Sequence, residues 1–227
     1  MMSRLKLRKK TSINLAFLLA YFLSFSVFAN DSLSENVGAI TPERQTIAKA
    51  ITLERESYVQ TANYHPDRPE EEAALVRMPE LERKGQFEEM VSYADELLKI
   101  NPYNLDALNN KVGANKRLGR KQEMTEAINR WVGIFDSILL SGNGTSFDTA
   151  YKVIAFSEEA RMLEFFKMRL ESRKLVEHDG KTYHFLMVAN PETKKKYEVY
   201  FEITRLFQTF KNDEIRRTLN VPLTQEK

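Results

Sequence analysis

The segment SGNGTSFD, residues 141–148, contains the residue types that most suggest a chemical role. Glycine-rich loops can bind phosphate through backbone amides, and a serine on a sharp turn can act as a nucleophile. A phosphate-binding loop needs the spacing GxxxxGK[ST], however, and a nucleophile elbow needs GxSxG between a strand and a helix. The segment fits neither pattern. We therefore predict a structural loop that ends the preceding helix through a left-handed glycine, formed by Ser141, Gly142, Asn143, Gly144 and Thr145.

The other side chains that could support acid–base or metal chemistry are scattered. His65, His178 and His184 are far apart and lack a ligand spacing such as HExxH. The chain has no cysteine, which excludes disulfides, thiolate metal sites and cysteine nucleophiles. Acidic pairs such as Glu158-Glu159 precede predicted helices, where the helix dipole accounts for them. The sequence therefore predicts no catalytic residue, no metal site and no cofactor.

The first 29 residues differ in composition from the rest of the chain. Five basic residues lie between positions 4 and 10, a largely apolar run follows from Ile13 to Phe28, and Ala29 supplies a small residue for cleavage. This pattern predicts a secretory signal peptide over residues 1–29, cut after Ala29. The alternative is a retained membrane anchor, because the uncharged run is nearly long enough to span a bilayer. We expect a periplasmic or secreted protein.

Cleavage changes the charge balance of the chain. The whole chain has 34 basic and 32 acidic residues, and removal of the five basic residues of the signal leaves 29 against 32, a net charge of −3. A chain so close to neutral has no global field that would attract nucleic acid or anionic lipid. We expect no nucleic-acid partner and no stable membrane insertion after cleavage.

The sequence predicts a flexible leader over residues 30–40 and a series of helices over residues 41–140. Thr41-Pro42 is a helix start, with a hydroxyl at the N-cap and proline at the first helical position. Apolar stripes at helical spacing predict further helices over 70–84, 85–102, 104–118 and 121–140. Pro79 lies in the middle of one of them and lacks an amide donor, so we expect it to kink or split that helix.

Gly85 and Gly119 are 34 residues apart, and each precedes a helix with an apolar stripe. This spacing resembles the tetratricopeptide repeat over roughly residues 70–131, about one and a half repeats. In that family the first helix of each pair lines a concave groove that binds peptides. Transferred by position, the resemblance implies a binding groove lined by Asp106, Asn109 and Lys116.

Residues 141–227 change to a mixed pattern. Residues 151–156 fit either a strand or a helix that starts at Phe147. Asp179-Gly180 predicts a tight hairpin turn, and the alternation over 197–204 predicts a strand with one buried face. A final helix is predicted from about residue 205 to 219. Because the helices come first and the strands follow as an antiparallel meander, we predict an α+β fold closed by a C-terminal helix.

Several motifs together resemble one known family. They are Asn101-Pro102 followed by Asn104-Leu105 and Ala107, the pattern SGxGxSxxTAxxVI from residue 141, and a closing FxI strand. On these motifs, residues 85–210 resemble a bacterial envelope family catalogued as domain of unknown function 4919. The resemblance implies export and this architecture, and it implies no activity.

Three functions are consistent with these patterns. We predict a non-catalytic module that binds another envelope protein or a peptide, since helical arrays present an extended concave surface. The alternative is an envelope hydrolase or a small-ligand receptor that uses a cleft between the helical and β parts. A catalytic version requires titratable side chains such as Asp148 and His184 to meet in one pocket. A third reading is a domain that only stabilises a larger envelope assembly.

Overall fold

The structure is a computed structural model that describes residues 40–66 and 68–218. The predicted signal peptide and the leader up to residue 39 therefore lie outside the described residues. In the described part of the chain, no helix is both long enough and apolar enough to cross a membrane.

Five helices form the first half of the described chain, as the sequence predicts. They are α2 (Pro42–Tyr58), α3 (Pro69–Lys84), α4 (Phe87–Ile100), α5 (Leu105–Leu118) and α6 (Lys121–Leu139). The Thr41 side chain caps α2 by accepting from the Arg44 amide at 3.4 Å. Gly85 and Gly119 end α3 and α5 in the left-handed conformation, with φ of 70° and 72°. The helix α3 runs unbroken past Pro79, so the expected split does not occur.

The second half of the chain forms a four-stranded sheet and two helices. The elements are β1 (Tyr151–Lys152), α7 (Phe156–Phe165), β2 (Arg169–His178), β3 (Lys181–Ala189), β4 (Lys196–Glu202) and α8 (Thr204–Thr218). The sheet order is β1-β4-β3-β2. Strands β2, β3 and β4 are the predicted antiparallel meander. Strand β1 pairs parallel with β4, which makes the sheet mixed and assigns residues 151–152 to a strand.

Local turn chemistry sets the register of the meander. Asp179 and Gly180 have φ of 47° and 73°, the positive values that a two-residue hairpin turn needs at both positions. Along β4 the side chains alternate as predicted, with Val199 and Phe201 buried and Glu198 exposed. These two signals fix which face of the sheet meets the helices.

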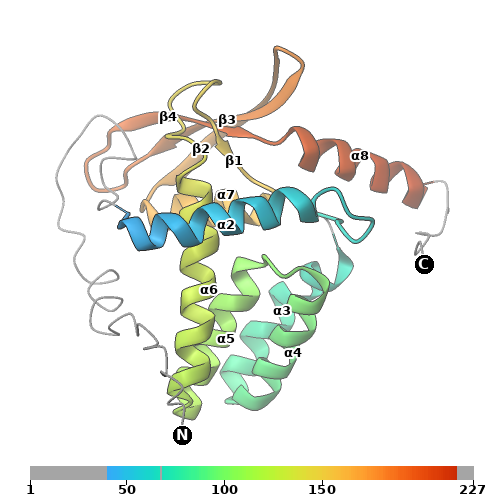
Figure 1. Cartoon of the computed structure of the whole chain (residues 1–227), viewed down its shortest axis with the longest axis vertical. Helices are drawn as coiled ribbons and strands as arrows, with labels where there is room; N and C mark the ends of the chain where they lie inside the picture. Colours follow the sequence, from blue (N-terminus) through green and yellow to red (C-terminus); the bar gives the residue numbers. More distant parts are fainter. Residues whose placement is uncertain (1–39, 67, 219–227) are drawn as a thin grey trace, which may run out of the picture.

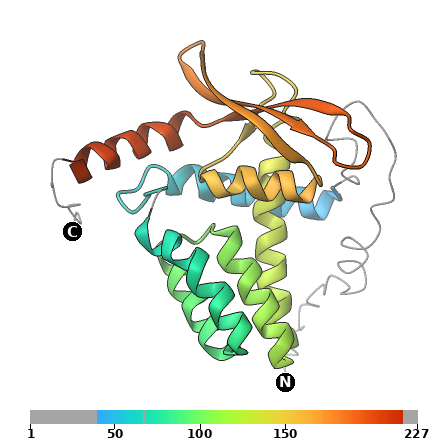
Figure 2. The same ribbon diagram turned by 180° about the vertical axis from the view of Figure 1, so that it is seen from behind.

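Figures 1 and 2 show how the elements are arranged. The sheet lies at one end of the molecule, α2 and α7 cross beneath it, and α3, α4 and α5 pack side by side at the other end. Helix α6 runs from the helical end to the sheet, and α8 leads away from the sheet to one side. The α+β fold class predicted from the sequence is confirmed.

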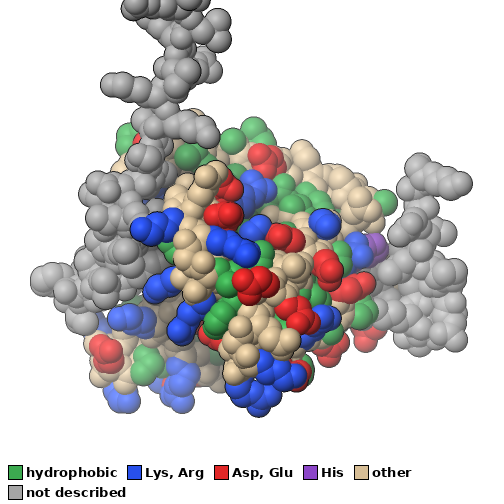
Figure 3. All heavy atoms as spheres, turned by 90° about the horizontal axis from the view of Figure 1, so that it is seen from below, with side chains coloured by type: hydrophobic (Ala, Val, Ile, Leu, Met, Phe, Trp, Pro, Cys, Tyr) green, Lys and Arg blue, Asp and Glu red, His purple; other side chains and the backbone are tan. Residues whose placement is uncertain are grey.

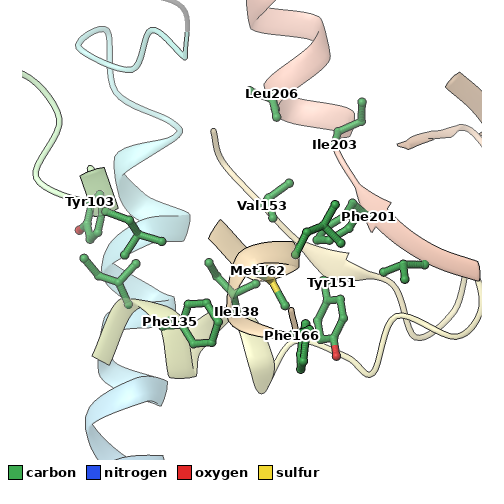
Figure 4. Close-up of a cluster of buried hydrophobic side chains, with 14 of the residues drawn as sticks. Tyr103, Phe135, Ile138, Tyr151, Val153, Met162, Phe166, Phe201, Ile203 and Leu206 are labelled. Carbon is green, nitrogen blue, oxygen red and sulfur yellow. The ribbon is translucent and has the colours of Figure 1, made fainter. Parts of the chain in front are cut away.

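The main hydrophobic core joins the two halves of the chain (Figure 4). Ile134 and Ile138 of α6 lie in one cluster with Met162 of α7 and Phe201 of β4, and each of these side chains is fully buried. A second cluster packs α3 and α4 against α5, and the partly buried Leu98 contacts both clusters. The predicted change of region at residue 140/141 is therefore a change of secondary structure inside one shared core.

Candidate functional site

The helices α3 and α5 and the start of α7 enclose a groove of about 510 Å³. We call it the helical groove. Its walls combine apolar side chains, amides and charged groups. Among the lining residues are Arg68, Glu71, Glu72, Leu75, Met78, Pro79, Asn104, Asp106, Asn109, Asn110, Phe156 and Arg161. If the helices are paired as in the tetratricopeptide-like repeat, α3 pairs with α4 and α5 pairs with α6, so α3 and α5 are the first helices of their pairs.

The cap at the start of α5 orients the polar wall of the groove. The Asn104 side chain accepts a hydrogen bond from the Ala107 amide at 2.8 Å, which starts the helix at Leu105. Asp106 then lies in the first turn, and Asn109 and Asn110 lie three and four residues later on the same side. Asn110 donates to the Asp106 carbonyl at 2.9 Å, whereas Asn109 is exposed.

Two carboxylates of the groove are partly buried. Burial raises the pKa of Asp106, and the Arg161 guanidinium, 2.5 Å from its Oδ1, opposes that shift. Burial likewise raises the pKa of Glu71, although Asn101 donates to its Oε1 at 2.9 Å. Each carboxylate is thus held by a donor from another part of the chain, which fixes its orientation in the groove.

The apolar wall lies on α3. Leu75 and Val76 are 67% and 75% exposed, and Leu75 lines the groove together with Met78 and Pro79. Pro79 has no amide hydrogen, so the Leu75 carbonyl lacks the donor that an interior helix residue normally provides. The tolerated proline therefore removes one helical hydrogen bond in the turn that carries the exposed Leu75.

Two of the three predicted groove residues line this groove. Asp106 and Asn109 are part of its wall, whereas Lys116 is exposed farther along α5 and is not. The sequence did not point to Glu71, Phe156 or Arg161. Phe156 and Arg161 come from α7, whose approach to α5 depends on contacts far apart in the chain, and no local pattern carries that information.

The loop Ser141–Thr145 has a packing role that differs from the predicted one. Helix α6 ends at Leu139 and its C-cap Leu140 has right-handed backbone, so neither glycine terminates it. Gly142 is needed because an added Cβ would lie 2.2 Å from the Thr149 carbonyl oxygen. Gly144 has φ of 72°, and its carbonyl accepts from the Tyr200 amide of β4 at 2.9 Å. Asn143 accepts from the Thr145 amide and hydroxyl at 3.1 and 2.7 Å.

The acidic pair at the start of α7 also departs from its predicted explanation. Glu158 is buried and forms a two-pronged ion pair with Arg55 of α2, with nitrogen–oxygen distances of 2.6 and 2.9 Å. Glu159 is buried too; His184 Nδ1 lies 2.7 Å from its Oε1, and an Arg173 nitrogen lies 3.1 Å from its Oε2. The contacts with Arg55, His184 and Arg173 therefore explain these two carboxylates better than the helix dipole does.

The Glu159–His184 pair resembles the carboxylate–imidazole part of a catalytic triad, but its surroundings differ. His184 points to the helix side of the sheet, where the Phe156 ring stacks on it. The segment that carries Asp148 packs through Phe147 on Tyr183 and Tyr200, side chains of the opposite face. Asp148 and His184 thus do not share a pocket. Within residues 40–66 and 68–218, no group of three or more metal-ligating side chains converges.

Comparison with known families decides the classification. The family model described as Domain of unknown function (DUF4919) matches residues 56–212, more than half of the chain. The protein belongs to this family. The DUF4919 range contains the helical groove, the loop Ser141–Thr145 and the Glu159–His184 pair, and it begins one residue after Arg55. Comparison with curated proteins and with solved structures gave no match.

Helix α2 begins outside the DUF4919 range but is fixed to it by charge. The Arg44 guanidinium meets Asp136 of α6 at 2.5 and 2.8 Å, and Arg55 meets Glu158. Between them Ile51 packs over Gly133, where an added Cβ would lie 2.4 Å from the Ile51 side chain. The residues before position 56 are therefore an integral part of the folded core.

Proposed function

We propose that this chain is a non-catalytic binding module whose helical groove holds an extended segment of another polypeptide. The observation that carries the proposal is the composition of the groove, in which an exposed apolar wall on α3 faces a row of amides on α5. A volume of about 510 Å³ lies within the range of about 300–1,000 Å³ that ligand sites occupy.

The amide wall suits the backbone of a peptide. Asn109 is exposed and forms no hydrogen bond within the described residues, so its amide can donate to one peptide carbonyl and accept from one peptide amide. Across the groove, the Leu75 carbonyl lacks its usual helical donor. Together they offer one donor and two acceptors to the backbone of an extended segment.

The remaining walls suit side chains of a peptide. Leu75 and Met78 offer apolar contact, Arg68 and Arg161 are cationic, and Glu71, Glu72 and Asp106 are anionic. Charges of both signs occur beside each other, which favours a mixed polypeptide over a uniformly charged polymer. Figure 3 shows the same intermixing of basic and acidic side chains over the helical end of the molecule among the residues drawn in colour.

We also propose export of the chain to the bacterial envelope and a partner in that compartment. The composition of residues 1–29 supports export, and the absence of cysteine makes the chain independent of oxidation state there. A non-catalytic role is supported by the enclosure of His184 between Glu159 and Phe156 and by the separation of Asp148 onto the other sheet face.

The proposal is tested with peptides selected from a random phage-displayed library on the purified chain. Their affinities are then measured by calorimetry for Asn109→Ala and Leu75→Asn in the groove, and for Asn212→Ala on the exposed side of α8 as a matched control. We expect each groove variant to weaken binding by about two- to tenfold, the effect of losing one hydrogen bond or apolar contact. Selection of no peptide, or equal affinities for groove and control variants, would refute the proposal.

A further inference from the structure

A second cavity of about 610 Å³ lies between α2, the end of α6, β1 and the start of α8. It shares no lining residue with the helical groove, so inferences about it do not depend on the proposed function. The cavity is formed where helical and β parts of the chain meet. Four of its lining residues, Lys49, Thr52, Leu53 and Arg55, precede the range that the family model matches.

Apolar side chains form part of the lining of this cavity, and we call them the apolar strip. Leu53 of α2 is 66% exposed and Leu140 after α6 is 40% exposed, and both line the cavity. Ile154 is half-buried, and Val59 and Val153 are buried at 7% and 5% exposed; all three also line the cavity. Large apolar side chains as exposed as Leu53 and Leu140 are unfavourable in water when they gather around a cavity, and a ligand with an apolar body would cover them.

The rim of the cavity is rich in cations. Lys49, Lys152 and Arg205 line it, all three are exposed, and none forms an ion pair within residues 40–66 and 68–218. Arg205 donates through Nε to the Val59 carbonyl at 3.0 Å, which holds the guanidinium at the rim. Glu56 and Glu202 also line the cavity, so cations outnumber carboxylates there.

We propose that this cavity binds a long-chain fatty acid. The acyl chain would cover the strip from Leu53 to Ile154, and the carboxylate would meet the cations of the rim. An anionic group at one end of an apolar body is what the combination of an apolar wall and unpaired cations recognises. A neutral or cationic amphiphile would bring no anionic group to those cations.

The test measures displacement of fluorescent cis-parinaric acid by palmitate on the purified full chain. We expect palmitate to displace the probe and to bind about tenfold more tightly than its uncharged methyl ester or hexadecylammonium, because the three chains are equally long and only palmitate carries the anion. Absence of displacement by palmitate, or equal displacement by the three amphiphiles, would overturn the proposal.

Variants locate the site on the surface. Lys152→Glu should weaken palmitate binding about three- to tenfold by reversing one exposed charge, while Lys174→Glu on the exposed strand β2 should not. Leu53→Asn should weaken it, and Leu75→Asn in the helical groove should not. All four positions are exposed, so far-ultraviolet circular dichroism should show unchanged folding. If Lys152→Glu and Lys174→Glu bind palmitate equally, the second cavity is not the site.

Discussion

At the scale of single residues, buried charged side chains connect elements that are far apart in the sequence. Arg55 and Glu158 are both nearly inaccessible to water, and their carboxylate also accepts the Ile154 amide at 2.9 Å. The pair thus connects α2, the end of β1 and the start of α7. Removal of one member leaves an uncompensated charge in the interior, which is far less favourable than removal of both.

We therefore predict a non-additive pair of substitutions. Arg55→Met should lower the free energy of unfolding by about 3–5 kcal/mol, because it leaves Glu158 buried and unpaired. The double variant Arg55→Met with Glu158→Gln should regain most of that loss, since the glutamine oxygen can still accept from Ile154. Urea denaturation measures both, with Lys84→Met in the exposed pair with Glu80 as a control of little effect. Equal losses for the single and double variants would contradict this account.

Glu71 gives a prediction about pH. Burial raises the pKa of Glu71 in the folded protein, so the folded state binds its proton more tightly than the unfolded chain does. The contribution of Glu71 to stability therefore falls as pH rises from its ordinary pKa of 4.5 through the raised pKa. Glu71→Gln removes this titration, and its stability relative to the unmodified chain should increase between pH 4 and pH 7.

Glu80 on the same helix serves as the control. A hydrogen bond from Lys84 lowers the pKa of Glu80, so its contribution to stability is present above its ordinary pKa and is lost as pH falls through the lowered one. Glu80→Gln should therefore show the opposite trend over the acidic range. Denaturation curves at several pH values measure both variants, and parallel trends for the two would show that burial does not govern Glu71.

At the scale of elements, the loop after α6 packs closely against the sheet and connects α6 to it. Ser141 accepts from the Lys152 amide of β1 at 2.8 Å, and Gly144 accepts from Tyr200 of β4. An added Cβ at Gly144 would lie 2.5 Å from the Tyr151 ring. The glycines therefore allow the loop to approach the sheet closely, which explains their presence without any ligand.

The substitution Gly142→Ala tests the close packing of this loop. The added methyl group would meet the Thr149 and Ala150 carbonyl oxygens at 2.2 and 2.6 Å, so the backbone must move. We expect a loss of about 1–3 kcal/mol in the free energy of unfolding. Gly113→Ala within α5 is the matched control: nothing lies within 4 Å of its added Cβ, and helix propensity predicts a gain of about 0.5–1 kcal/mol. A neutral Gly142→Ala would show that the loop tolerates the extra atom.

The elements that the sequence predicted correctly are those set by nearby residues. Thr41 caps its own helix, Gly119 ends the helix just before it, and Asp179-Gly180 turns its own hairpin. The predictions from the sequence were incomplete where a residue's partner lies far away in the chain. Glu158 pairs with a residue 103 positions away, and β1 is a strand only because Phe201 lies beside Tyr151. Helical periodicity alone could not choose between strand and helix for residues 151–156.

At the scale of the whole molecule, the two cavities lie where the halves of the chain meet. The helical groove needs α3 and α5 from the helical half and α7 from the other half. The repeat-like spacing placed Asp106 and Asn109 on the side of α5 that lines the helical groove, but it could not supply the wall from α7. The second cavity likewise combines α2 with β1 and α8. Both cavities are formed by tertiary packing, which cannot be read from a single sequence.

The central claim is that the helical groove holds a polypeptide segment. It is tested by placing a photoreactive amino acid at Leu75 in the groove, or at the 49% exposed Leu175 on β2, in cells that produce the full chain. The account predicts that light links Leu75 to one defined segment of a partner protein, that Asn109→Ala reduces this product, and that Leu175 does not form it. Identical products from Leu75 and Leu175, or none from Leu75, would contradict the account.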